Sequence, residues 1–381
     1  MIGLDEIRYD RIRRDKIRQD PNKGPKTMPK PKIVKPEKSD VEQIKARAKE
    51  SPEKIVVTPN KGDFGTVIST GSTLLDLAIS GGRVRGGGVP SGILLEVFGP
   101  SSVGKSSVLA EMCADTQFKG GKVKFLDPEA RLDAEYMRIY GMELGKEDYH
   151  MPDTVNEVFD HILNWKPPKA PEGSTNIIAT DSLAALSSDL EMSDKGDKRG
   201  QKIAKDFSQG LRKTCRLIKR NKFIIACSNQ VRQGDTGEVT SGGKGIPFYA
   251  SLRIRVGPPA QNKYLTKTAT INGVKHDKIY GIQSICTIKK SSIDDPYRTA
   301  PIFIVFGFGI DDIRGNLTYL KQMTDSDKYD GITQEFGRID TAITHIEENN
   351  LELELKNKVI DLWEEIENKF KVVRKPKIRG L

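Results

Sequence analysis

Short apolar runs alternate with helical stretches through the middle of the chain, from residue 93 to residue 256. The runs are rich in β-branched residues and mostly apolar on both faces, which is typical of strands buried between two layers of helices. Strands of this kind, separated by helices, predict an α/β fold in which a mainly parallel sheet carries helices on both faces. Later runs predict that the sheet continues as an antiparallel edge. The parallel runs span residues 93–98, 122–126, 176–180, 222–228 and 252–256, and the later ones 283–289 and 301–306.

The N-terminal part of the chain has a different pattern. Residues 1–20 carry an irregular apolar stripe beneath a basic face, which fits a docking helix, a DNA-contacting arm or a solvated tail. Five prolines interleaved with lysines between residues 21 and 36 predict an extended linker. A short helical pattern at 41–50 and a strand at 55–57 come before the core.

The C-terminal part predicts a small α/β unit after Gly309, which ends in a helical pattern at 351–370. The residues after Phe370 are basic and include no acid. Composition and pattern together divide the chain into four expected parts. These are a basic N-terminal segment (1–60), a core (61–310), a small lobe (311–370) and a basic tail (371–381).

Composition narrows the class of protein. Apolar residues make up 36% of the chain and charged residues 30%, so part of the chain is expected to be tail or linker. No apolar run is long enough to span a membrane, and residues 1–20 are too charged for a secretory signal, so we expect a soluble, cytoplasmic protein. The net charge of +10 favours a polyanionic partner, with nucleic acid first. The four cysteines lack C-x-x-C spacing and are expected to be buried, reduced thiols.

The first candidate for a ligand-binding site is the loop Gly-Pro-Ser-Ser-Val-Gly-Lys-Ser at residues 99–106, which lies between a predicted strand and a predicted helix. Such a loop turns backbone N–H groups and the positive end of the helix dipole toward a phosphate. Lys105 is expected to reach the β- and γ-phosphates, and the Ser106 hydroxyl to bind Mg²⁺. The alternative is a glycine turn that only joins the two elements. The expected nucleotide-binding residues are Gly99, Pro100, Ser101, Ser102, Val103, Gly104, Lys105, Ser106 and Ser107.

Polar side chains follow three other predicted strands, and the carboxyl ends of parallel strands share one edge of a sheet. Asp181 follows the run at 176–180 and is expected to hold Mg²⁺. Glu129 follows the run at 122–126, where it could activate a water, or be a surface salt-bridge residue instead. Gln230 follows the run at 222–228, where an amide could sense a γ-phosphate or simply cap a helix.

Two glycine-rich polar stretches leave the nucleotide side of the sheet, at 191–201 and 231–245. Both are too irregular for buried elements, and a mobile loop beside a phosphate sensor can bind a second ligand. Their basic side chains favour a nucleic-acid backbone as that ligand. These residues are Lys195, Lys198, Arg199, Arg232 and Lys244.

These motifs closely resemble the RecA family of recombinases, which includes bacterial and phage members of the UvsX type. Seven blocks match the family in the right order, and the resemblance runs from residue 66 to residue 309. A weaker similarity at 341–370 lies where the family has a C-terminal DNA-binding lobe, so the resemblance implies that the small lobe at 311–370 binds DNA. The blocks lie at 69–76, 98–106, 125–133, 181–186, 208–213, 229–232 and 242–251.

The resemblance implies a RecA-type ATPase core that binds ATP with Mg²⁺ between neighbouring subunits of a helical filament. It makes Glu129 the catalytic base, with Lys105 and Gln230 as the other catalytic residues. Asp133 and Tyr136 become adenine contacts, with Tyr136 stacked on the base. The expected DNA-binding residues are Lys198, Arg199, Ser208, Arg212, Arg232, Val239, Ser241, Gly242, Gly243 and Lys244.

The function that the resemblance implies is homologous recombination. The protein would polymerise on single-stranded DNA, pair it with homologous double-stranded DNA and exchange strands, with ATP hydrolysis stimulated by DNA. Residues 1–20 and the strand near Ile55 would dock on an adjacent subunit, and mediator or single-strand-binding proteins are possible partners. A RecA-fold helicase or motor, and an accessory paralogue that hydrolyses ATP weakly, are the alternatives.

Three features depart from the family pattern. The second loop has no aromatic residue, so Val239 is the candidate for an apolar wedge between bases. Where the family often places two basic residues that reach a neighbour's phosphates, this chain has Lys290 and then Ser292. The C-terminal tail is basic, whereas the bacterial family commonly ends in an acidic one. We therefore expect the tail to strengthen DNA binding.

Overall fold

The computed structural model describes residues 62–187, 199–234, 237–241, 243 and 245–374. These residues belong to one unit of the chain, Thr58–Leu381. The predictions for residues 1–60 lie outside the described residues. So do Lys195 and Lys198 of the first loop, Gly242 and Lys244 of the second, and the tail from residue 375.

The predicted sheet is confirmed. In the described part of the chain it has eleven strands, of which nine follow the order β13-β12-β11-β9-β3-β7-β6-β4-β5, while β10 pairs with β11 and β8 with β7. The strands from β9 to β5 are parallel, and those on the other side of β9 form the expected antiparallel edge. The parallel strands are β3 (Leu94–Gly99), β4 (Val123–Leu126), β5 (Tyr149–His150), β6 (Ile177–Thr180), β7 (Ile224–Gly234) and β9 (Leu252–Gly257). The antiparallel ones are β8 (Gly237–Thr240), β10 (Tyr264–Ile271), β11 (Val274–Ser291), β12 (Thr299–Val305) and β13 (Gly309–Ile310).

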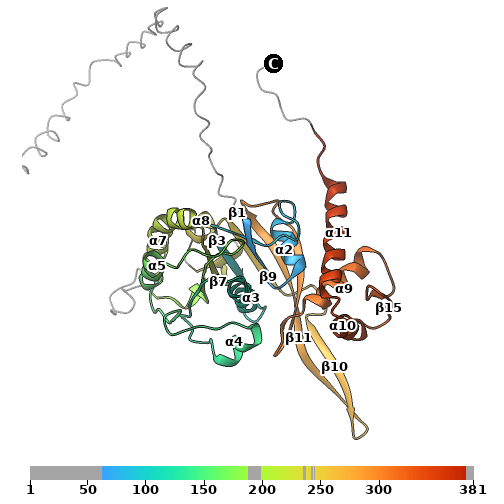
Figure 1. Ribbon diagram of the computed structural model, residues 1–381. Coiled ribbons are helices and arrows are strands. Elements are labelled where there is room, and N and C mark those ends of the chain that lie inside the picture. The colour runs from blue at the N-terminus through green and yellow to red at the C-terminus, as the bar shows by residue number, and fades with distance from the viewer. Residues whose placement is uncertain (1–61, 188–198, 235–236, 242, 244, 375–381) are drawn as a thin grey trace, which may run out of the picture. The chain divides into compact units, whose positions relative to one another are not determined.

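Helices cover both faces of the sheet, as the apolar runs predict (Figure 1). Alternate residues of one strand point to opposite faces, so Leu94 packs with the helices of one face and Leu95 with those of the other. On the Leu94 face lie α5 (Val155–Asn164), α7 (Arg199–Asn221) and α8 (Gly245–Tyr249). On the Leu95 face lie α2 (Thr73–Ser80) and α3 (Lys105–Phe118). The remaining core elements are α4 (Ala134–Tyr140), η1 (Leu183–Ala185) and the pair β1 (Asp63–Ile68) and β2 (Val89–Ser91).

The C-terminal part of the described chain follows the large sheet and shares a hydrophobic cluster with its Leu95 face. It contains α9 (Asp312–Met323), β14 (Tyr329–Asp330), β15 (Glu335–Phe336), α10 (Ile339–Glu348) and α11 (Glu352–Phe370). Arg298 connects it to the core, because its guanidinium lies 2.7 Å from the Glu367 carboxylate of α11 and 5.1 Å from the ring centre of Trp363. The same guanidinium pairs with Asp294 at 2.8 Å.

One prediction about the second loop is wrong. We expected 231–245 to be irregular, but β7 continues to Gly234 and pairs antiparallel with β8, so the first half of this stretch is a hairpin. Arg255 of β9 holds the hairpin through two hydrogen bonds to Glu238, at 2.6 and 2.7 Å. This ion pair to another strand of the sheet helps to hold residues whose own pattern is polar and glycine-rich.

The prediction that the cysteines are buried is confirmed for three of the four, and Cys215 is only partly buried. All four cysteines are free, and Cys113, Cys227 and Cys286 are buried. Burial raises the pKa of the Cys113 and Cys227 thiols and brings that of Cys286 to about 12. These thiols therefore stay protonated and act as small apolar side chains.

Candidate functional site

The glycine loop lies between β3 and α3, as predicted. Gly104 has a φ of +90° and caps α3 without any side-chain hydrogen bond. A Cβ at Gly104 would lie 2.0 Å from Ile304 Cδ1, and one at Gly99 would lie 1.9 Å from the Val256 carbonyl oxygen. Only glycine fits at these two positions, and the N–H groups at the start of α3 remain available to an anion.

Lys105 points back over the loop that precedes it. Its Nζ donates to the Pro100 carbonyl oxygen at 2.6 Å. Burial lowers the pKa of Lys105, while the nearby charges of Asp181 and Glu129 oppose that shift. A partly desolvated ammonium held at the mouth of the loop is well placed to exchange this carbonyl for a phosphate oxygen.

Ser106 and Asp181 meet at the end of β6. The Ser106 hydroxyl hydrogen-bonds the Asp181 carboxylate, and the Ser228 hydroxyl at the same edge of the sheet donates to the Asp181 Oδ1. Burial raises the pKa of Asp181, while these two hydroxyls counteract that shift. Among the described residues no group of three or more potential ligands is found, yet Mg²⁺ that binds together with phosphates needs only one or two protein oxygens. The pair therefore fits a nucleotide-bound Mg²⁺.

Glu129 faces the same space from the loop after β4. Its Oε1 accepts from the Ser182 hydroxyl at 2.7 Å, and its Oε2 lies 2.9 Å from the Arg131 guanidinium. The turn that carries it is shaped by the buried Asp127, which accepts from the Leu132 backbone N–H at 2.8 Å and from the Tyr149 hydroxyl at 2.9 Å. Sequence reasoning assigned no role to Asp127 or Ser182, although both are polar residues at the carboxyl end of a strand.

Gln230 reaches the glycine loop from β7, since its side-chain amide donates to the Ser101 hydroxyl. Its neighbour Asn229 is fully buried and donates to Glu96 Oε1 and to the Ser241 carbonyl oxygen, both at 3.0 Å. The other oxygen of the buried Glu96 carboxylate pairs with Arg253 at 2.5 Å. Two adjacent residues, Asn229 and Gln230, thereby contact the second loop and the glycine loop respectively.

A cavity of about 340 Å³ joins these groups. It is lined by Ser101, Ser102, Val103, Gly104, Lys105, Ser106, Ser107, Phe125, Asp127, Glu129, Arg131, Leu132, Tyr136, Asp181, Ser182 and Gln230. The structure thus brings together the loop, the two strand-end carboxylates and Gln230. The volume is within the range of small-ligand sites.

A second cavity of about 470 Å³ shares Ser102, Gly104, Ser107 and Tyr136 with the first. Its other lining residues are mostly apolar or aromatic and come from α4 and the antiparallel edge, including Tyr140, Ile304, Phe306 and Gly307. A planar apolar group attached to phosphates fits this arrangement. Phe306 and Gly307 were missed because they follow an antiparallel strand, where the rule about strand ends does not apply.

The two residues expected to contact adenine differ in their placement. Tyr136 lines both cavities and packs against Tyr140 with ring centres 4.9 Å apart. Asp133 lines neither cavity, and its carboxylate caps α4 by accepting from the Tyr136 backbone N–H at 2.7 Å. Asp133 therefore holds the helix that carries Tyr136.

The described DNA-binding candidates lie on α7 and on the β7–β8 hairpin. Arg212 is exposed on α7 and Ser208 is partly buried on the same helix, while Arg199 is its first residue. Arg232 and Val239 are directly opposite one another in the hairpin, and Val239 is 48% exposed. Ser241 and Gly243 follow the hairpin. A basic and an apolar side chain are thus presented side by side on one face of a ribbon.

Lys290 is turned toward its own chain. Its Nζ donates to the carbonyl oxygens of Pro247 and Phe248, both at 2.8 Å, at the end of α8. Burial and the nearby Arg253 lower its pKa. Lys290 lines neither of these two cavities of the single chain.

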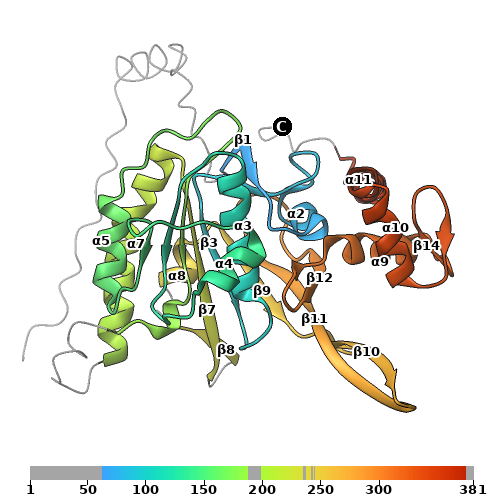
Figure 2. The same ribbon diagram turned by 60° about the horizontal axis from the view of Figure 1, so that its bottom comes forward.

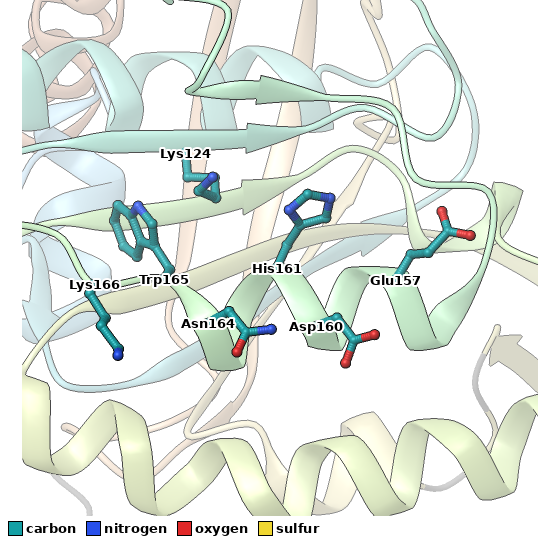
Figure 3. Close-up of a pocket in the computed structure, with 7 residues that line it drawn as sticks. All are labelled: Lys124, Glu157, Asp160, His161, Asn164, Trp165 and Lys166. Carbon is teal, nitrogen blue, oxygen red and sulfur yellow. The ribbon is translucent and has the colours of Figure 1, made fainter.

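Another hollow, of about 320 Å³, lies beside α5 (Figure 3). Figure 3 shows His161 and Trp165 pointing from the α5 segment toward the strand that carries Lys124. The His161 ring stacks on His150 with centres 4.2 Å apart, and Lys124 Nζ lies 2.9 Å from His150 Nε2. No residue predicted for the nucleotide or DNA sites lines this hollow.

Comparisons with known proteins agree with the motifs. The family model described as the RecA N-terminal domain matches residues 45–311. Protein RecA of Delftia acidovorans is 31% identical over 311 residues, which cover 77% of this chain and 78% of that protein. Protein RecA of Trichodesmium erythraeum is 32% identical over 298 residues, with coverage of 74% and 76%. Among the described residues, no helix is both long and apolar enough to cross a membrane.

Proposed function

The chain belongs to the RecA family, and we propose that it is an ATP-dependent recombinase that polymerises on single-stranded DNA and catalyses homologous pairing and strand exchange. The observation that carries this proposal is the convergence of Lys105, Glu129, Asp181 and Gln230 on one cavity. A phosphate loop alone would support only nucleotide binding. The Glu129 carboxylate supports ATP hydrolysis, and the Gln230 amide supports a dependence of that hydrolysis on bound DNA.

In the proposed reaction, ATP places its phosphates over the glycine loop and its base in the adjoining cavity beside Tyr136 and Phe306. Ser106 and Asp181 would hold Mg²⁺, which neutralises charge on the β- and γ-phosphates when bound. Lys105 leaves the Pro100 carbonyl and binds a phosphate oxygen. Glu129, oriented by Ser182, accepts the proton of the attacking water.

Gln230 and Asn229 supply the proposed connection to DNA. A γ-phosphate near Ser101 would compete for the Gln230 amide, which now donates to the Ser101 hydroxyl. The adjacent Asn229 holds the Ser241 carbonyl. Movement of this part of β7 would therefore shift the second loop, where Arg232, Val239, Ser241, Gly242, Gly243 and Lys244 are the proposed contacts to single-stranded DNA. Lys198, Arg199, Ser208 and Arg212 complete the proposed DNA site.

We propose that neighbouring subunits close the ATP site in a filament. Lys290 is the proposed contact to a neighbour's phosphates, and two of the three N–H donors of its ammonium bond carbonyl oxygens of its own chain. The segment 1–60 is the proposed docking element for the adjacent subunit. Mediator and single-strand-binding proteins remain proposed partners.

The test measures ATP hydrolysis with and without single-stranded DNA. We expect DNA to stimulate the wild-type rate, and Glu129→Gln to lower it by about 10²–10⁴-fold while ATP binding persists. Glu135→Gln is the matched control, because Glu135 is an exposed acid six residues away that lines neither cavity. A rate unaffected by DNA contradicts the recombinase mechanism, and an unchanged rate in Glu129→Gln contradicts the assigned base.

Strand exchange is tested separately with a labelled duplex. Filaments formed on single-stranded DNA are expected to displace a strand from a homologous duplex and not from a heterologous one. Unwinding without regard to homology would instead indicate a helicase or motor. DNA binding without exchange or turnover would indicate an accessory paralogue.

A further inference from the structure

Tyr140 is the last residue of α4, and sequence reasoning assigned it no role. The helix stops there because Gly141 follows with a φ of +67°, a left-handed conformation that favours glycine. The helix α4 lies beside α3, which follows the glycine loop, in both views of the molecule (Figures 1 and 2). The end of α4 thereby places the Tyr140 side chain at the first turn of α3.

The Tyr140 hydroxyl is hydrogen-bonded to the start of α3, because it donates to Ser107 Oγ at 2.7 Å. Ser107 is the third residue of α3, directly after the proposed Mg²⁺ ligand Ser106, and it is only 7% exposed. Burial raises the pKa of the Tyr140 phenol, so this phenol stays protonated and can act as a donor. A serine hydroxyl that accepts this hydrogen bond still has its own hydrogen to donate.

The Tyr140 ring packs against Tyr136 and against β13. Its centre lies 4.9 Å from that of Tyr136, one helical turn earlier, and the two ring planes are inclined by 49°. A Cβ at Gly309 would lie 3.1 Å from Tyr140 Cε1, so the start of β13 passes close to the same ring. A tilted aromatic pair contributes more than its buried area alone. Tyr136, the residue expected to stack on the base, is therefore braced by Tyr140.

Tyr140 contacts the junction between the two cavities described above. The residues that line both of them are Ser102, Gly104, Ser107 and Tyr136. A nucleotide with its phosphates in the first cavity and its base in the second passes its sugar and α-phosphate across these residues. Tyr140 contacts Ser107 through its hydroxyl and Tyr136 through its ring, and it does not line the first cavity. It can therefore affect how a nucleotide is held without touching the groups proposed for hydrolysis.

We propose that Tyr140 is a positioning residue for the nucleotide. Its hydroxyl occupies an acceptor site of Ser107 Oγ, which directs the Ser107 hydrogen toward an oxygen of the sugar or of the α-phosphate. Its ring holds Tyr136 in the orientation that stacks on the base. This inference rests on the proposed function, because it takes the bound ligand to be ATP. The alternative is that the contact between Tyr140 and Ser107 only packs α4 on α3.

The first test is Y140F, which removes the hydroxyl and keeps the ring. Equilibrium binding of ATP with Mg²⁺ is measured without DNA, and KM and kcat are measured with saturating single-stranded DNA. We expect the Kd and KM for ATP to rise about tenfold, as for the loss of one hydrogen bond to a charged ligand, with kcat unchanged. The control is Y297F, at a tyrosine that is 74% exposed and lines neither cavity. An unchanged Kd in Y140F, or a fall in kcat at unchanged KM, would overturn the proposal.

A double-mutant cycle shows whether Tyr140 acts through Ser107. S107A should weaken ATP binding by itself, because it removes the hydroxyl that Tyr140 orients. Y140F should then have little further effect in the S107A protein. Equal weakening by Y140F in the two backgrounds would exclude the route through Ser107. A packing role alone would lower the urea midpoint of nucleotide-free Y140F and leave its Kd for ATP unchanged.

The ring is tested with Y140L, which keeps an apolar side chain and removes the aromatic contact with Tyr136. The probe is 2-aminopurine riboside triphosphate, whose fluorescence falls when its base stacks. At saturation the wild type and Y140F should quench the probe equally, and Y140L should quench it much less. Equal quenching by Y140L would exclude the ring from positioning Tyr136.

These measurements separate the role of Tyr140 from the proposed function. ATP binding is measured without DNA, so it tests Tyr140 even if single-stranded DNA fails to stimulate hydrolysis. In that case the recombinase mechanism fails, and the Kd of Y140F still decides whether Tyr140 positions the nucleotide. Absence of ATP binding by the wild-type protein would overturn both.

Discussion

The side-chain amide of Asn229 lies 3.0 Å from the backbone carbonyl oxygen of Ser241, twelve residues further along the chain. The same amide donates to the buried carboxylate of Glu96, so its orientation is fixed from the core of the sheet. Gln230, the proposed phosphate sensor, is the next residue. This contact therefore joins the neighbour of a residue that lines the candidate nucleotide cavity to the far part of the second loop.

Asn229→Ala should weaken the coupling between DNA and ATP. The substitution frees the Ser241 carbonyl and leaves Gln230 in place, so the rate without DNA should hold while stimulation by DNA falls about tenfold, within the usual range of coupling energies. The measurement is the hydrolysis rate at saturating ATP with increasing single-stranded DNA. Asn221→Ala, an exposed asparagine at the end of α7, is the control. Full stimulation in Asn229→Ala would exclude this route.

Ser182→Ala should affect hydrolysis more than Arg131→Ala does, although both residues contact the Glu129 carboxylate. Ser182 is buried and donates to Oε1 at 2.7 Å, whereas the Arg131 side chain is 82% exposed and its ion pair is screened by water. We expect kcat to fall about tenfold in Ser182→Ala with KM for ATP unchanged, because the base is misplaced and the phosphate loop is intact. Equal effects of the two substitutions would count against Ser182 as the residue that positions Glu129.

Local sequence patterns predicted the sheet, the phosphate loop and the groups at the strand ends. The reason is that buried parallel strands have a distinctive composition and their carboxyl ends share one edge. The same reasoning could not predict the apolar cavity beside Tyr136, since Phe306 and Gly307 reach it from the end of an antiparallel strand far along the chain. It also missed the β7–β8 hairpin, which the Arg255–Glu238 pair holds in place across two elements. Contacts between distant segments leave no periodic signal in the sequence.

The β10–β11 ribbon is another such case. Its residues lack the alternation of apolar and polar positions that a half-buried strand shows, because both of its faces are exposed. The sequence predicted a strand at 283–289, which is the part of β11 that enters the core and is mostly buried. It did not predict the exposed first part of β11. An element that packs on no other described part of the chain shows no core-facing pattern from which it could be recognised.

Glu111→Gln should make the protein more stable at neutral pH. Glu111 lies on α3 near the carboxylates of Asp76, Asp115 and Asp312, and burial together with these charges raises its pKa from 4.5 to about 7. Between those two pH values the unfolded chain releases a proton that the folded chain keeps, so wild-type stability falls as pH rises. Glutamine does not ionise, so the Glu111→Gln protein does not lose this stability as pH rises.

The expected difference in the free energy of unfolding reaches about 3 kcal/mol above pH 7 and vanishes below pH 4.5. It is measured by urea unfolding of both proteins across this pH range. Glu143→Gln, at an exposed acid after α4, should follow the wild-type curve at every pH. A Glu111→Gln curve that stays parallel to the wild-type curve would show that Glu111 titrates normally.

Removal of residues 371–381 should weaken DNA binding. This tail is basic and contains no acid, so it attracts a polyanion and releases counterions when it binds one. The truncated protein should bind single-stranded DNA more weakly at low salt, with a smaller salt slope, and should approach the wild type as salt increases. A full-length variant with serine in place of every lysine and arginine of the tail separates charge from length, and should behave like the truncation. Tighter DNA binding by either variant would identify the tail as inhibitory.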